Sequence, residues 1–246
     1  MKNKRLTIIL IIFTVFVLVI CLTSALFMLN SVSVNFLSTA TIFVNRQQDI
    51  IDSGQFDYGK NVLFLNKKKY IQNLELNNPY LKVINIETIF PNKLKINCIE
   101  RAQLFYVEYG ENIFALDEDF KVLDKLNYNY EDLINIDISC GNELVIGQVC
   151  YEIMNIYKQL PTILKEWNID VDYLKSKIKS VKISNNILKI RCRDKKDIII
   201  KNWFENASEK SNIAFSVYED DKIYDYDYIS VYENSSKKIT CVVGKY

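Results

Sequence analysis

The longest apolar run in the chain lies near its start. No charged residue occurs from Leu6 to Leu29, and a helix of that length reaches roughly 35 Å, enough to cross a hydrocarbon core ~30 Å thick. Lys2, Lys4 and Arg5 precede the run, and the positive-inside rule assigns such a cluster to the cytoplasm. We therefore predict a short cytoplasmic tail at residues 1–5, a transmembrane helix at residues 6–29, and an extracytoplasmic remainder.

A cleaved signal peptide is the competing interpretation of this run. The run is longer than the apolar core of about 7–15 residues that signal peptides carry. Thr23–Ala25 is also a poor cleavage site, because it is embedded in apolar sequence. Both observations favour a retained anchor.

The next segment begins with short, mixed patterns. Valines alternate with serines over residues 31–38, which predicts a strand leaving the membrane. A short helix is predicted over Arg46–Asp52, and Gly54 would end it. Val62–Leu65 is a short apolar run, which we interpret as a buried strand.

A second helix has clear signals at both ends. Asn66 is a good N-cap residue, and the helix must end by Asn77 or Asn78, because the residue before Pro79 is pushed out of the α region. One face of this helix carries the apolar side chains Tyr70, Ile71 and Leu74.

A hairpin closes this part of the chain. Pro91 and Asn92 suit a turn, and the strand before them would place Ile84, Ile86, Thr88 and Phe90 on one face. The return strand would place Leu94, Ile96 and Cys98 on one face. The predicted order is β-α-α-β-β, which forms a compact module over residues 30–100.

The rest of the chain, residues 101–246, is predicted to be a β-rich domain. Alternating or short apolar runs predict strands at residues 104–107, 113–116, 180–184, 188–192, 198–201, 228–232 and 239–243. A helix is predicted at residues 148–160, and residues 203–218 fit either a helix or a strand. The fold class is therefore α+β, with an N-terminal transmembrane helix, a small module and a mixed β-rich domain.

Composition excludes several classes of function. The net charge is +1, too small for a field that would attract nucleic acid. The chain has no histidine, so the usual general base and the commonest zinc ligand are missing. The six cysteines match no metal motif, and we interpret them as small buried apolar residues. We expect no cofactor, no metal and no small-molecule substrate.

Several motifs occur in one order at a fixed distance from the predicted anchor, and together they resemble the bacterial cell-division family FtsQ/DivIB. The similarity is sharp from about Ser53 to Leu123. The matching pieces are Ser53–Gly54, Gly59–Leu65, Asn78–Ile84, Phe90–Ile96, Glu100–Arg101 and Asp117–Leu123. The resemblance implies that residues 30–100 form a POTRA-like module.

The chain departs from the family pattern at four places. The usual Gly-Asn pair is missing around Phe36–Thr39. Phe120 stands where the family normally has glycine, and Ser230 stands where many members have aspartate. The predicted cytoplasmic tail is short for the family, which argues against an important cytoplasmic interaction.

The resemblance implies a non-enzymatic scaffold of the division septum. Such a protein binds the FtsB/DivIC and FtsL proteins and so helps to place the septal peptidoglycan synthase. In this family a partner segment adds as a strand to the last strands of the β domain. The candidate partner-binding residues are Tyr228, Ile229, Val231, Tyr232, Thr240 and Val242. The alternative for each residue is that it simply packs the core of the last hairpin.

Two other classes of function stay open from sequence. One is a membrane-anchored extracytoplasmic enzyme acting on wall polymers, which would need a carboxylate pair or an activated nucleophile. The other is a POTRA module that assists protein export.

Overall fold

A computed structural model describes residues 10–18, 24–38, 42–43, 46–127, 130–138, 140–220 and 225–246. The predicted tail at residues 1–5 lies outside these residues, as do residues 6–9 and 19–23 of the predicted membrane helix. Residues 10–18 are helical and exposed. Within the described part of the chain, no helix is long and apolar enough to cross a bilayer.

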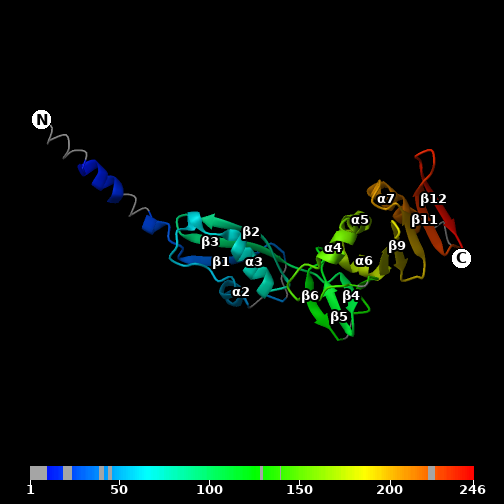
Figure 1. The fold of residues 1–246 in the computed structure, drawn as a ribbon, viewed down its shortest axis with the longest axis horizontal. Helices are drawn as coiled ribbons and strands as arrows, with labels where there is room; N and C mark the ends of the chain where they lie inside the picture. The colour runs from blue at the N-terminus through cyan, green and yellow to red at the C-terminus, as the bar shows by residue number, and fades with distance from the viewer. Residues whose placement is uncertain are drawn as a thin grey trace. The chain divides into compact units, whose positions relative to one another are not determined.

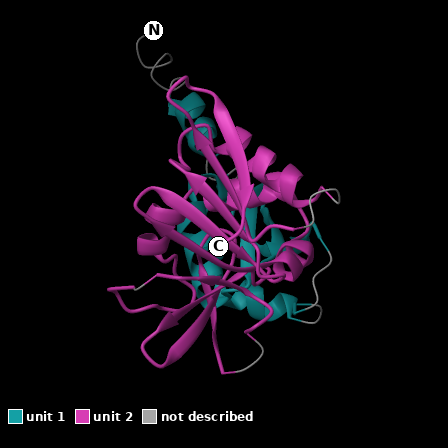
Figure 2. Cartoon of the chain, turned by 90° about the vertical axis from the view of Figure 1, so that its right-hand side faces the viewer, with its two compact units in different colours: residues 1–101 teal, residues 102–246 magenta. Residues whose placement is uncertain are grey.

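The chain forms two compact units, Met1–Arg101 and Ala102–Tyr246 (Figure 2). Each unit buries a hydrophobic cluster of its own.

The first unit has the predicted β-α-α-β-β order (Figure 1). Its described strands form one sheet in the order β1-β3-β2, with β1 parallel and β2 antiparallel to the central β3. The elements are β1 (Ser31–Phe36), α2 (Gln47–Ser53), the 3₁₀ helix η1 (Val62–Phe64), α3 (Lys67–Asn77), β2 (Leu81–Ile89) and β3 (Lys93–Glu100).

Helix α3 begins and ends where the sequence predicts. The Asn66 side chain accepts a hydrogen bond from the Lys69 amide at 3.2 Å, and Asn78 caps the other end, just before Pro79. Tyr70 and Leu74 are fully buried under the helix. The capping residue and the proline therefore fix the length of α3, and its apolar face fixes its orientation.

Two predictions in this unit are wrong. Val62–Leu65 is not a strand, because Val62–Phe64 forms a 3₁₀ helix. The register of β2 also shifts between Val83 and Asn85, so Ile86 is buried while Ile84 is 48% exposed. A bulge inserts one extra residue and moves the side chains beyond it to the opposite face.

The second unit contains a long mixed sheet. Among its described residues, nine strands follow the order β12-β11-β10-β9-β8-β7-β4-β5-β6. The strands are β4 (Phe105–Tyr109), β5 (Asn112–Leu116), β6 (Val122–Leu126), β7 (Ile134–Ile136), β8 (Ile178–Ser184), β9 (Ile187–Cys192), β10 (Asp197–Lys201), β11 (Tyr228–Glu233) and β12 (Ile239–Gly244). Every strand that the sequence predicts in this unit is present, whereas β6 and β7 were not predicted.

The helices of this unit are α4 (Tyr151–Tyr157), α5 (Leu160–Trp167), α6 (Val171–Lys177) and α7 (Ala207–Tyr218). The helix predicted at residues 148–160 is present in part: α4 lies within this range but ends at Tyr157, and a second helix, α5, begins at Leu160 with Pro161 in its first turn. Proline suits the first turn of a new helix. The ambiguous segment 203–218 contains α7, which connects the parallel strands β10 and β11 and packs on both. Helices α4, α5 and α7 follow one another along one side of this unit (Figure 1).

Phe120, the residue in the family's glycine position, keeps a glycine-like backbone. Its φ is 59°, in the left-handed region. The Asp117 carboxylate supports the turn by accepting hydrogen bonds from the amides of Asp119 and Lys121, each at 2.9 Å. The Phe120 ring is buried and stacks on Phe105, with ring centroids 5.5 Å apart. The turn therefore adopts a backbone conformation that favours glycine, while the Phe120 side chain adds to the core.

We expect Phe120→Gly to destabilise the second unit by roughly 2–4 kcal/mol. Loss of a buried ring costs about 3–5 kcal/mol, and relief of the left-handed backbone returns about 1 kcal/mol. Phe120→Ala loses the ring without that relief, so it should be less stable than the glycine variant. Urea unfolding of the three proteins checks this order, and a glycine variant as stable as the parent would contradict it.

Candidate partner-binding site

Strand β12 forms one edge of the long sheet. Of the strands that the structure describes, β11 alone pairs with it. An edge strand carries outward N–H and C=O groups that can pair with a strand from another protein. We call β12 the open edge.

The other edge, β6, is partly covered by the chain itself. The Val122 amide donates to the Gln148 carbonyl at 2.9 Å, and the Val122 carbonyl accepts from the Gly147 amide at 2.8 Å. Lys121 also forms a bridge with Val149. These contacts leave less of β6 free to accept an added strand.

Two of the predicted site residues point into the core. Ile229 and Val231 are fully buried in the same cluster as Ala214 and Phe215 of α7. Their side chains pack in the core, as the alternative interpretation expects. Their role is to hold β11 in place beneath the open edge.

The other four predicted residues share the opposite face of the last two strands. Tyr232 lies across from Thr240, and Ser230 lies between Tyr228 and Tyr232, across from Val242. Val242 is 41% exposed. Tyr228, Tyr232 and Val242, though not Thr240, line a hollow of about 480 Å³ together with Ile199, Lys201, Ser230, Lys245 and Tyr246. We call this surface the open face.

The sequence did not identify Ile199 and Lys201 as residues of this site, because their place in it depends on how the strands pair. Ile198, Ile199 and Ile200 form an unbroken apolar run that gives no sign of which side faces solvent. The parallel register with β11 places Ile199 beside Ser230. Only the long-range pairing of β10 with β11 reveals that Ile199 belongs to the site.

Aromatic rings give the open face its shape. The rings of Tyr228 and Tyr246 are 5.3 Å apart, and the Lys201 ammonium lies 5.3 Å from the centre of the Tyr232 ring. A Cβ on Gly244 would lie 2.5 Å from the Tyr228 hydroxyl, so the missing side chain gives Tyr228 room to lie across β12. Tyr246 is exposed, and Tyr228 and Tyr232 are partly exposed. Tyrosines in such positions beside a sheet edge are suitable anchors for a protein partner.

A hydrogen bond to the buried Asp197 carboxylate holds Tyr246 against the open face. Asp197 is fully buried, and its carboxylate accepts hydrogen bonds from Lys189 at 2.8 Å, from the Tyr246 hydroxyl at 2.6 Å, and from both arms of the Arg191 guanidinium. Burial by itself raises the pKa of the Asp197 carboxyl, but these hydrogen bonds outweigh burial and hold that pKa below its ordinary value.

We expect Asp197→Asn to destabilise the protein by roughly 1–3 kcal/mol at pH 7, because Lys189 and Arg191 lose their shared counter-ion. A lowered pKa in the folded state gives stability that is present above the unfolded pKa of about 3.9 and lost as the pH falls through the folded pKa. The deficit of the variant should therefore shrink in acid.

Urea unfolding at pH 7 and at about pH 3 checks this expectation. Asp225→Asn is the matched control, since the ion pair of Asp225 with Lys245 is largely exposed and should contribute little. An equal deficit for Asp197→Asn at both pH values would contradict the account.

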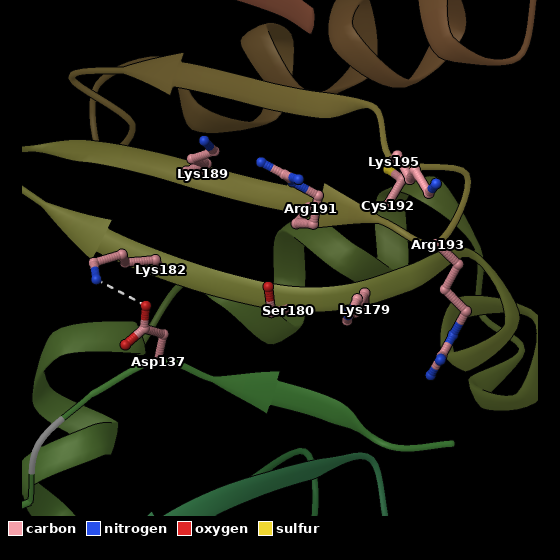
Figure 3. Close-up of a pocket in the computed structure, with 9 residues that line it drawn as sticks. All are labelled: Asp137, Lys179, Ser180, Lys182, Lys189, Arg191, Cys192, Arg193 and Lys195. Atoms are coloured by element: carbon pink, nitrogen blue, oxygen red, sulfur yellow. Dashed lines mark hydrogen bonds and ion pairs between the residues drawn. The ribbon is translucent and has the colours of Figure 1, made fainter. Parts of the chain in front are cut away.

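A second hollow, of about 420 Å³, opens on β8 and β9 and is strongly cationic (Figure 3). Lys182 and Lys189 lie directly opposite each other across these strands, where like charges repel. Asp137, which pairs with Lys182 at 2.7 Å, is the one carboxylate among the described residues that line it. The cations lining it are Lys179, Lys182, Lys189, Arg191, Arg193 and Lys195. Such a surface suits an anionic group on a ligand or partner.

The buried cysteines Cys98 and Cys192 are poor nucleophiles. Burial raises the pKa of the Cys98 thiol to about 11 and that of the Cys192 thiol to about 12, so both thiols are protonated at neutral pH. In the part of the chain that the structure describes, no group of three or more acidic or cysteine side chains is arranged to hold a metal ion.

Comparison with known proteins points to one family. Residues 45–101 match the POTRA domain, FtsQ-type. The chain is 31% identical over 163 residues to the cell division protein DivIB of Clostridium acetobutylicum, covering 65% of this chain and 59% of that protein. It is 29% identical over 174 residues to DivIB of Clostridium tetani, covering 70% of this chain and 64% of that protein. A DivIB from Clostridium botulinum is 33% identical over 151 residues, covering 59% of this chain and 56% of the relative.

The chain thus spans less than two thirds of the length of these relatives. Among solved structures, it is similar to the major extracytoplasmic domain of DivIB from Geobacillus stearothermophilus. The likeness covers 51% of this chain and 98% of that one, at 13% identity and a TM-score of 0.31, and this score is too low to support a detailed structural correspondence. The FtsQ-type POTRA match over residues 45–101 and the DivIB relatives confirm the resemblance to the FtsQ/DivIB family that the sequence motifs indicate.

Proposed function

We propose that this protein is a non-enzymatic, membrane-anchored scaffold of the bacterial division septum. It binds proteins of the FtsB/DivIC and FtsL type and so links them to septal peptidoglycan synthesis. Its relatives carry the name cell division protein DivIB, which supports a role in division. The observation that carries the proposal of partner binding is the open edge β12, which lies beside an aromatic open face.

Partner binding proceeds by strand addition along β12. An extended partner segment pairs its backbone with the outward groups of β12, and this gives affinity without a fixed sequence. Its alternate side chains then fall beside Thr240 and Val242 on the open face, where Tyr228 and Tyr232 supply aromatic contacts. The backbone edge sets the geometry, and the side chains of the open face give selectivity.

The anchor at residues 6–29 confines the protein to the membrane, with the amino terminus in the cytoplasm and residues 30–246 outside. Its support is the uncharged run in the sequence and the basic residues before it. Confinement to one membrane raises the effective concentration of the partners for each other. A modest affinity at β12 then suffices for assembly.

We expect Val242→Lys to weaken binding of the DivIC-type partner at least tenfold, because a flexible cation would sit where a partner side chain packs. Pull-down with the full-length proteins measures the loss. Ile169→Lys is the matched control, since Ile169 is an exposed apolar residue between α5 and α6, outside the open face. Unchanged capture by a folded Val242→Lys protein would count against strand addition at β12.

The cellular role predicts a location. The full chain, fused to a fluorescent protein that folds outside the cytoplasm, should gather in a band at midcell as constriction begins. A uniform membrane signal throughout division would oppose the septal role and favour the wall-enzyme or export alternatives.

A further inference from the structure

One end of the first unit exposes a group of large apolar side chains. Phe64 is 85% exposed and Phe90 is 63% exposed. Around them, in the described part of this unit, lie four more exposed apolar residues: Leu26, Met28, Leu63 and Ile89. We call these six residues the apolar end.

The apolar end is built from three segments that hydrogen bonds hold together. The Val62 amide donates to the Phe27 carbonyl at 2.8 Å, which joins η1 to residues 26–30. The Asn30 amide donates to the Asn92 carbonyl at 2.9 Å, which joins the same segment to the tip of the β2–β3 hairpin.

Ring packing and backbone pairing support the same arrangement. The rings of Phe27 and Phe90 meet edge to face at 6.0 Å, and Met28 forms a bridge with Asn61. The exposed side chains therefore belong to one connected end of the module rather than being scattered singly. Connected apolar surfaces of this kind mark sites that contact a membrane or a protein partner.

The position of the apolar end along the sequence indicates what lies next to it. Leu26 and Met28 of the apolar end lie at the carboxyl end of the uncharged run Leu6–Leu29, which forms the proposed anchor. The exposed side chains thus begin where the chain would leave the bilayer. Lys93 at the hairpin and Lys68 and Lys69 at the start of α3 are exposed and lie in the neighbouring elements.

We propose that the apolar end inserts into the interfacial layer of the same bilayer that the anchor crosses. Phenylalanine, leucine and methionine side chains suit the boundary between headgroups and acyl chains, and flanking lysines suit anionic headgroups. This second contact holds the hairpin tip and η1 at the membrane surface, so that the first unit cannot swing freely about the end of its anchor. The inference rests on the proposed anchoring of the chain.

The test uses the full chain in vesicles whose lipids carry bromine close to the headgroup, because bromine quenches tryptophan fluorescence on contact. Phe64→Trp places the reporter on the apolar end. Leu76→Trp is the matched control, an exposed apolar residue near the end of α3, whereas η1 lies just before the start of that helix. The parent protein supplies the background from Trp167 and Trp203.

We expect the bromolipid to quench the Phe64→Trp signal at least twofold and to leave the Leu76→Trp signal unchanged. Phe90→Trp, a second reporter on the same end, should behave like Phe64→Trp. Circular dichroism checks that each variant is folded.

Three results would overturn the proposal, and they are distinguishable. A chain that fails to float with the vesicles removes the anchor and with it the proposed function. A chain that floats while both reporters stay unquenched and open to an aqueous quencher leaves the anchor intact and removes the interfacial contact. Reporters shielded from both quenchers would indicate a protein surface, such as a second copy, as the true occupant.

Discussion

The arrangement of the second unit depends on how α7 packs against the sheet. Because β10 and β11 are parallel, the chain must cross from the end of one to the start of the other, and α7 makes that crossing. Its residues Ala214 and Phe215 share a core with Ile229 and Val231. This packing commits one face of β11 to the interior, so Tyr228 and Tyr232 must lie on the other face. β12 then follows by a hairpin and becomes the open edge.

Much of this fold can be predicted from local patterns. The cap at Asn66 and the stop before Pro79 fix α3, and alternating residues or short apolar runs predict every strand from β8 to β12. One failure is caused by a single inserted residue. The bulge between Val83 and Asn85 reverses the facing of Ile84, and no pattern of apolar residues announces a bulge. Val62–Leu65 is too short for its period to tell a 3₁₀ helix from a strand.

The candidate site can likewise be predicted from local patterns only in part. Alternation places Tyr228, Tyr232, Thr240 and Val242 on one face of the last hairpin, and the structure agrees. Ile229 and Val231 lie in the core because they fall on the alternate positions of β11. The contributions of Ile199 and Tyr246 depend on contacts between distant parts of the chain, namely the β10–β11 pairing and the Asp197 carboxylate. Such contacts leave no local signal in a single sequence.

The central claim is that a partner strand pairs with β12, and amide hydrogen exchange tests it most directly. The full chain would be compared alone and in complex with its DivIC-type partner, residue by residue. The account predicts that amides of Ile239–Gly244 gain protection in the complex, whereas those of Val122–Leu126 at the other edge do not change. Protection confined to β6, or a complex that forms with no change at β12, would contradict it.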